Sequence, residues 1–374
     1  MKNNIENKDM NTSNSKNQNS DKSIKWYEFH PSDTLFLRGS EPMVSGTSYE
    51  TTQLFPPPVS VISGAIRTAV LAQKNISIKR YKEGDPIKEL IGKYGEHGDN
   101  LPFNVVGPFL KVGENYFVPA PYTWFVDEDK SGKKEESKKN ENSEKKKEIK
   151  KTSEKSDVQP SKTITVLEAA PLDSKIINSL GLKSSSRITG WVKHKNEIKT
   201  VGGSWVSLSA LLNGDLEFKD GETIFNSKKE TSKLFFKEER IGIKFDSKRV
   251  VEESKLYMSR HIRLKPDVSL VWGIDRDCGL EDQGVISIGG EQRFGRYRAI
   301  QPKLNLSESS THNQYLALSP VEVNKISSDA LIASGKIVYR GGWDIAKQFH
   351  KDMRGFFPAG SVFSSLVDSG CIPI

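Results

Sequence analysis

The sequence predicts an α+β fold, because short runs of strand type outnumber segments with helical periodicity in both halves of the chain. The chain has 374 residues, which is enough for two medium-sized domains with their own cores. No repeat of fixed period is present, so a solenoid is not predicted. The order of elements favours α+β sandwiches over a doubly wound parallel sheet.

Two segments lack the apolar content that is needed to offset the entropy of ordering. Residues 1–25 are rich in Asn, Lys and Ser, and we expect a disordered tail there. Residues 127–161 interleave Lys with Glu, so we expect a disordered charged insertion in a loop. Because the charges of this insertion nearly cancel, we do not interpret it as a basic arm for nucleic acid.

The remaining chain divides near Leu234, where an alternating strand pattern starts again. We expect an N-terminal module over 26–234, which contains the insertion, and a C-terminal module over 235–374. Strand-like runs occupy 26–29, 35–38, 104–110, 116–119, 163–167, 240–246, 256–264 and 285–288.

A proline run at 56–58 leads into the clearest helical pattern of the chain. Its predicted buried stripe consists of Val61, Ile62, Ala65, Ile66, Ala69 and Val70. Ser60, Gly64 and Arg67 follow one another on a second face, and Ser60 is a candidate N-cap. Gly64 indicates close approach of a ligand or of another backbone, and the first-turn amides suit a phosphate. The alternative is a helix docked on a sheet, in which Gly64 only permits close packing.

A second segment, residues 285–298, runs from an apolar strand into three glycines and then three arginines with aromatic residues between them. Glycines admit backbone amides to phosphates, arginine forks pair with phosphates, and Phe294 or Tyr297 offers a ring for stacking. The alternative is a glycine-containing hairpin with exposed arginines. The spacing matches neither a dinucleotide fingerprint nor a Walker motif.

The chain has 56 Lys and Arg against 48 Asp and Glu, which gives a net charge of +8 and a pI near 9.1. This charge balance favours an acidic macromolecular partner. Cys278 and Cys371 stand far apart, so we expect neither a disulfide framework nor a zinc site. No secretory signal and no membrane-length apolar segment is seen. We therefore expect a soluble cytoplasmic protein with no membrane partner, no cofactor and no small-molecule substrate.

Catalytic motifs are not evident, since the six histidines are scattered and no acidic cluster has metal-ligand spacing. Metal-independent RNA cleavage needs only one well-placed histidine, so His30 and His261 remain candidates for a general acid or base. The other interpretation is that both histidines are surface or RNA-contacting residues.

The motifs together resemble the Cmr-three family, which are RAMP subunits of the type III-B CRISPR effector complex. The resemblance is carried by residues 29–38, 54–58 with 64–69, 242–243 with 256–257, 289–295 and 358–362. It implies two tandem ferredoxin-like, RRM-type modules and a non-catalytic subunit. It also implies three partners: the 5′ handle of the guide RNA (crRNA), the large polymerase-like Cmr subunit and the Cmr backbone subunit.

The resemblance and the residue patterns together give a set of expected RNA-binding residues: Arg38, Ser60, Gly64, Arg67, Gly289, Gly290, Arg293, Phe294, Gly295 and Arg296. Substituting Arg67 or Arg293 is expected to weaken binding of the handle while the fold is kept. Two other hypotheses remain open at this point: an endoribonuclease that processes precursor crRNA, and a scaffold whose arginines make only protein contacts.

Overall fold

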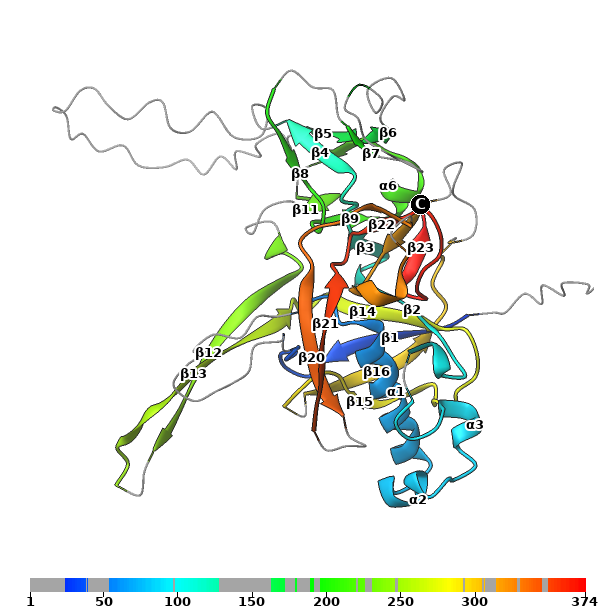
Figure 1. Ribbon diagram of the computed structural model, residues 1–374, viewed down its shortest axis with the longest axis vertical. Coiled ribbons are helices and arrows are strands. Elements are labelled where there is room, and N and C mark those ends of the chain that lie inside the picture. The colour runs from blue at the N-terminus through cyan, green and yellow to red at the C-terminus, as the bar shows by residue number, and fades with distance from the viewer. Residues whose placement is uncertain are drawn as a thin grey trace, which may run out of the picture.

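A computed structural model describes residues 24–37, 39, 54–96, 98–127, 163–171, 179, 189–191, 196–219, 221–225, 231–245, 248–291, 293–304, 306, 314–327, 330–344 and 349–374. Nearly all of the expected tail and of the expected insertion lies outside these residues. Lys25 and Asp127 are exceptions, because each belongs to a strand. The described chain is strand-rich with few helices, as the sequence predicted (Figure 1).

The largest described sheet has eight strands in the order β11-β9-β3-β2-β14-β1-β16-β15. All of its neighbouring strands pair antiparallel. Its strands are β1 (Lys25–Pro31), β2 (Val105–Val112), β3 (Asn115–Pro119), β9 (Trp205–Ser207), β11 (Ile224–Phe225), β14 (Val268–Ile274), β15 (Gln283–Ser287) and β16 (Phe294–Ile300).

β1 lies inside this sheet, between β14 and β16. Its Tyr27 and Phe29 alternate with Glu28 and His30, so the two pairs point to opposite faces of the sheet. The sheet thus combines strands from both sides of the predicted boundary near Leu234, and that boundary does not coincide with a division between sheets.

Helix α1 (Val59–Gln73) covers the face that carries Tyr27 and Phe29. Its buried apolar residues are Ile62, Ala65, Ile66, Ala69, Val70 and Leu71, so the predicted stripe is confirmed apart from the half-buried Val61. The chain continues through α2 (Ile78–Lys82), α3 (Lys88–Ile91) and the 3-10 turn η1 (Gly98–Asn100) before it enters β2.

A second four-stranded sheet, in the order β10-β5-β4-β8, extends beyond the β9 and β11 end of the large sheet (Figure 1). A second apolar cluster joins it to the large sheet through Val118, Trp124, Val206 and Phe218. Its elements and their neighbours are β4 (Trp124–Asp127), β5 (Thr163–Glu168), β6 (Ala170–Pro171), β7 (Thr189–Trp191), β8 (Ile198–Thr200), α6 (Leu208–Leu212) and β10 (Glu217–Lys219).

The C-terminal strands form a four-stranded sheet, β19-β22-β17-β23, and a three-stranded sheet, β18-β21-β20. Leu316, Val362 and Ile372 of the first sheet pack against Phe109 and Val271 on the face of the large sheet opposite α1. The elements are β17 (Tyr315–Ala317), β18 (Val321–Glu322), η2 (Val323–Lys325), β19 (Leu331–Ala333), β20 (Val338–Asp344), β21 (Phe349–Phe357), β22 (Val362–Phe363) and β23 (Cys371–Pro373).

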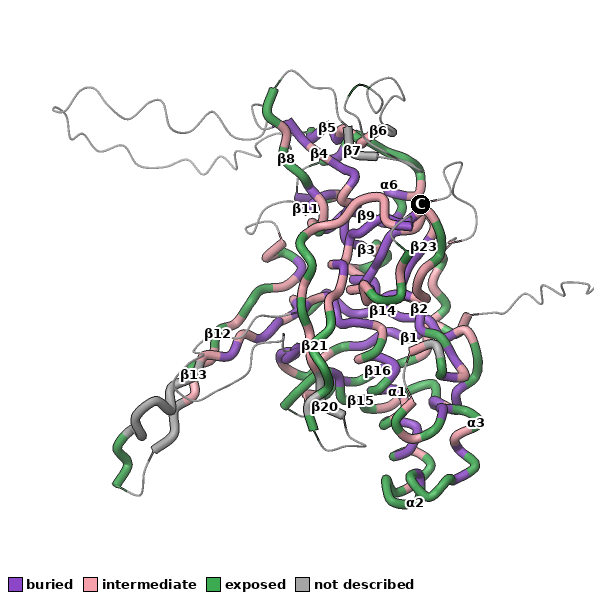
Figure 2. Tube along the Cα trace, viewed as in Figure 1, coloured by how far each residue is buried: buried purple, intermediate pink, exposed green. Residues whose placement is uncertain are grey.

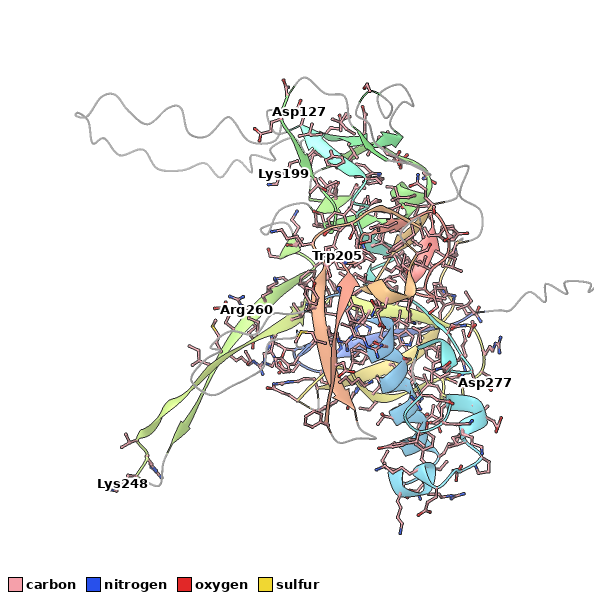
Figure 3. The ribbon with its side chains drawn as sticks, in the orientation of Figure 1. Asp127, Lys199, Trp205, Lys248, Arg260 and Asp277 are labelled. Atoms are coloured by element: carbon pink, nitrogen blue, oxygen red, sulfur yellow. The ribbon has the colours of Figure 1, made fainter. Side chains whose placement is uncertain are left out.

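A two-stranded hairpin of β12 (Phe235–Phe245) and β13 (Val251–Leu264) projects from the body of the molecule (Figure 1). We call it the long arm. Phe235 and Leu264 anchor its base in the main core, whereas Ile241 is 72% exposed. Burial is confined to the base of the arm, and its outer part is exposed where it is described (Figure 2). Figure 3 labels Lys248 at the far end of the arm and Arg260 nearer its base.

Candidate nucleic-acid interface

The segment between β15 and β16, described at residues 288–291 and 293, lies against the segment that follows β1. We call it the glycine turn. Gly289 has a φ of +90°, and the Gly290 amide donates to the Phe36 carbonyl oxygen at 2.8 Å. A Cβ at Gly289 would overlap this oxygen, and a Cβ at Gly295 would overlap the His30 carbonyl oxygen. The close approach that these glycines permit is therefore between parts of the chain itself.

Arg293 ends the glycine turn, and its guanidinium is held by two carboxylates. Nη1 donates to Asp33 Oδ2 at 3.0 Å, and Nη2 donates to Glu291 Oε2 at 3.1 Å. Arg240 of β12 and Arg263 of β13 also contact Asp33, at 3.0 and 2.8 Å. We call Asp33 with its three arginines the Asp33 clamp; it holds the glycine turn to the long arm.

The Asp33 clamp changes the acidity of its carboxyl group. Burial alone would raise the pKa of Asp33, but hydrogen bonds from Arg240 and Arg263 outweigh burial and lower this pKa to about 2. Glu238 pairs with Arg240 and Arg263, and Glu291 pairs with Arg293, so three carboxylates match the three guanidiniums. The charge of Arg293 is therefore already balanced inside the protein in the described arrangement.

His261 lies behind the glycine turn and is only 1% exposed. Its Nδ1 is 3.0 Å from the Thr34 hydroxyl, its Nε2 is 3.1 Å from the Ser259 hydroxyl, and its ring stacks on Phe36. Burial lowers the pKa of His261. A histidine with both ring nitrogens engaged in the interior is poorly placed for proton transfer to RNA.

The N-terminus of α1 has no side-chain cap and no acidic residue in its first turn. The prediction that Ser60 is the N-cap is wrong, because Pro58 takes that position with extended backbone angles and Ser60 lies inside the helix. The Pro58 carbonyl oxygen accepts from the Val61 and Ile62 amides. The amides of Val59 and Ser60 donate to no residue that the structure describes.

Arg340 of β20 reaches this helix end, where its Nη1 lies 3.4 Å from the Ser60 hydroxyl oxygen. Burial lowers the pKa of the Arg340 guanidinium, and no carboxylate among the described residues pairs with it. Gly64, one turn further on, is exposed, and a Cβ there would meet nothing within 4 Å. We call Ser60, Gly64, Arg340 and the free first-turn amides the α1 N-terminal site.

Arg67 shares the helix face of Ser60 and Gly64 but has an internal role. Its Nη1 donates to the Glu96 carbonyl oxygen at 2.5 Å, and its Nη2 donates to the Tyr81 hydroxyl and to the Lys93 carbonyl oxygen. These contacts tie α1 to the chain around α2 and α3. Arg67 therefore stabilises this region, and its guanidinium is largely unavailable to a phosphate.

Phe294 and Arg296 lie on the face of β16 that points away from α1. Phe294 is 52% exposed, and Arg296 is exposed and makes no ion pair with any described residue. Arg38 lies outside the described residues. Of the expected RNA-binding residues, the structure thus brings Ser60 and Gly64 together and leaves Phe294 and Arg296 open on a different face.

Arg340 was not among the expected RNA-binding residues. In the sequence, Arg340 is followed directly by two glycines and a tryptophan, over residues 340–343. This pattern alone is weak evidence of a binding site, because the sequence does not show which segment packs against it. The partner, the end of α1, is 280 residues away in sequence.

No group of three His, Cys, Asp or Glu side chains in the described part is placed to hold a metal ion. No helix in that part is long and apolar enough to cross a membrane.

The fold and these sites define a class of protein: a strand-rich α/β protein in which Arg296 and Arg340 make no ion pair with a described residue. The family model of CRISPR-associated proteins called Cas_Cmr3 matches residues 27–317, which is most of the chain. This protein belongs to the Cas_Cmr3 family.

A curated relative, the CRISPR system CMR subunit Cmr3 of Saccharolobus solfataricus, is 29% identical over 158 residues. The match covers 39% of this chain and about half, 49%, of the relative.

Among solved structures, a chain of the type III-B Cmr-beta complex bound to cognate target RNA aligns with a TM-score of 0.48 and 19% identity, covering 91% of this chain and 86% of the other. A chain of the type III-A Csm3-Csm4 subcomplex aligns with a TM-score of 0.42 and 12% identity, covering 94% and 99%.

Proposed function

We propose that this protein is a crRNA-binding subunit of the type III-B Cmr effector complex and that it holds the 5′ handle of the guide RNA in antiviral RNA-targeting defence. The observation that carries the proposal is the Cas_Cmr3 match over residues 27–317. The net charge of +8 supports it, because nucleic-acid affinity rests largely on contacts with the phosphate backbone.

The α1 N-terminal site supplies the chemistry that a handle phosphate needs. Free amides at a helix N-terminus carry partial positive charge, and an unpaired arginine adds a full charge beside them. The Ser60 hydroxyl is a further donor. Exposed Gly64 leaves room for the ribose–phosphate backbone to lie close to the helix.

The proposal includes a bridging position between the large polymerase-like subunit and the backbone subunit. The long arm supports it, because a two-stranded hairpin far from the core gains stability from a partner. Two apolar residues of the long arm are exposed: Ile241 is 72% exposed and Val250 is 60% exposed. In this arrangement one neighbour packs along the long arm and another along the β20–β21 hairpin, where Tyr339 and Met353 are exposed.

We further propose that the subunit is non-catalytic, acts in the cytoplasm, and is organised as two ferredoxin-like modules that share the eight-stranded sheet. The buried position of His261 supports the absence of catalysis. Incubating excess protein with precursor crRNA in the presence of a chelator is expected to leave the RNA intact. Cleavage that disappears in a His30→Ala variant would overturn this part of the proposal.

The direct test is purification of the full chain from cells that carry the complex, followed by sequencing of the bound RNA and mapping of ultraviolet crosslinks. We expect guide RNAs with a common 5′ sequence, crosslinked near Ser60 and Arg340. Affinity of the pure protein for a handle oligonucleotide should fall in Arg340→Gln. It should not fall in Arg276→Gln, which removes the same charge from an exposed turn. Equal affinities of the two variants would remove Arg340 from the site.

A further inference from the structure

The face of the large sheet opposite α1 is open where β1, β16 and β15 lie side by side. Every second residue of each strand points to this face, and paired residues of the three strands form rows across it. His30, Arg296 and Val285 are partners in one row, and Glu28, Arg298 and Gln283 are partners in the next. No described element covers these rows, in contrast to the other face, where α1 packs.

A hollow of about 770 Å³ lies over these rows and is lined by their six residues together with Gly284 and Tyr297. Its size falls in the range of sites for small organic ligands, about 300–1,000 Å³. Val285, at the edge strand, is 58% exposed, so the hollow opens directly to solvent.

The one carboxylate of the hollow, Glu28, is saturated by donors. Its Oε1 accepts from Lys111 at 3.0 Å and from Ser269 at 2.9 Å, and its Oε2 accepts two bonds from Arg298, at 3.0 and 2.8 Å. Glu28 therefore offers no free acceptor, and its negative charge is outweighed by nearby cations.

The remaining charge in the hollow is positive. Arg298 uses Nε and Nη2 on Glu28, while its side chain is 65% exposed and keeps Nη1 for another acceptor. Arg296 makes no ion pair with a described residue and is exposed beside it. The fork of Arg296 and the remaining Nη1 of Arg298, two residues apart on one strand, suit a phosphate group.

Flat and apolar groups adjoin these cations. Phe294 is two residues before Arg296 on the same face of β16, and it is 52% exposed. The His30 ring, which stands opposite Arg296, is 47% exposed. An exposed ring beside an arginine is the combination with which sheets bind single-stranded nucleotides, by stacking the base and pairing the phosphate.

We infer that this open sheet face binds a nucleoside phosphate, with the base against Phe294 or His30 and the phosphate on Arg296 and Arg298. This site is separate from the α1 N-terminal site, because it lies on the opposite face of the sheet. The choice of ligand rests on the proposed RNA-binding function. The same chemistry fits a nucleotide within an RNA strand and a free mononucleotide.

The test uses the full chain and two probes: a fluorescent single-stranded RNA with the handle sequence, and AMP as a competitor. Arg296→Gln and Phe294→Ala are each expected to weaken RNA binding about tenfold. Arg276→Gln, an exposed arginine outside the hollow, is the matched control and should change affinity little. Unchanged melting temperatures of the Arg296 and Arg276 variants show that folding does not cause the difference.

Competition assigns the source of the nucleotide. Displacement of RNA by AMP from the wild-type chain, with no displacement from Arg296→Gln, supports a site for free nucleotides. No displacement by AMP, together with a tenfold loss for RNA in Arg296→Gln, supports a site for a segment of the strand.

Two outcomes are unfavourable and can be told apart. If Arg296→Gln and Phe294→Ala bind RNA as tightly as Arg276→Gln while Arg340→Gln is weakened, the sheet-face site is wrong and the proposed function stands. If the wild-type chain binds no handle RNA, the proposed function fails as well.

Discussion

The glycine turn and the N-terminus of α1 both combine glycine with arginine, but the structure uses the two regions differently. In and directly after the glycine turn, Gly289 and Gly295 lie against the chain's own backbone, and Arg293 is paired with Asp33. At the end of α1, a Cβ on Gly64 would meet nothing within 4 Å, and Arg340 has no carboxylate partner among the described residues. An arginine next to a glycine therefore indicates an anion site only if its donors are not already bound inside the protein.

The largest expected effect is a difference in the free energy of unfolding between alanine variants of the glycines in the two regions. Gly295→Ala places a Cβ against the His30 carbonyl oxygen, so we expect it to lower the free energy of unfolding by more than about 3 kcal/mol. Gly64→Ala should instead raise this free energy by about 1 kcal/mol, because alanine is more favourable than glycine at an exposed position inside a helix. Denaturant unfolding of both variants measures the difference, and equal stabilities would contradict the comparison.

The next effect concerns the Asp33 clamp at acid pH. The folded-state pKa of Asp33, about 2, lies below the unfolded value of about 3.9. Its contribution to stability is therefore present above about pH 4 and is lost as the pH falls toward 2. We expect a loss of about 1–2 kcal/mol from this group, after discounting for its half-exposed side chain.

Asp33→Asn is the control for this titration, because it removes the carboxylate while keeping its shape. The variant should be less stable at pH 7 and should lose less stability between pH 4 and pH 2 than the wild type. Glu28, whose pKa is also lowered to about 2, continues to titrate in the variant, so part of the acid sensitivity remains. Identical pH profiles of the two proteins would exclude the clamp as an energetic link.

Much of the fold could be predicted from local patterns, but much of the candidate site could not. The strand at β1 and the apolar stripe of α1 follow from side-chain periodicity, which acts over a few residues. The pairing of β1 with β14 and β16 joins segments more than 200 residues apart, so a boundary near Leu234 looked reasonable in the sequence although the sheet crosses it.

The dependence on long-range contacts also explains why the sequence could not show which arginines are bound inside the protein. The sequence places Arg67 and Arg293 within three residues of a glycine. The acceptors that bind them, which are the Lys93 and Glu96 carbonyl oxygens and Asp33, depend on tertiary packing. Arg340 and Ser60 meet only through the fold. Which donors remain free is a property of the folded chain, not of a motif.

A third prediction tests this distinction directly through RNA affinity. Arg340→Gln should weaken binding of handle RNA about tenfold, which is the loss expected for one charge-assisted phosphate contact. Arg293→Gln should leave the affinity within about twofold and lower stability instead, because it breaks the Asp33 clamp. Anisotropy titrations and melting curves on the same samples provide both values. A tenfold loss in Arg293→Gln without a change in melting temperature would reverse the assignment of the two regions.

The smallest expected effect is a change in how steeply RNA affinity depends on salt concentration. This slope distinguishes an arginine that contacts a phosphate from one that affects binding indirectly. Each phosphate neutralised on single-stranded nucleic acid contributes about −0.7 to the slope of log affinity against log salt concentration. Arg340→Gln and Arg296→Gln should each make the slope shallower by about this amount, since neither guanidinium makes an ion pair with a described residue. Arg293→Gln and Arg67→Gln should leave the slope unchanged, because their charges are already matched or bound to internal acceptors. A shallower slope for Arg67→Gln would mean that RNA binding releases this arginine from the Lys93 and Glu96 carbonyl oxygens.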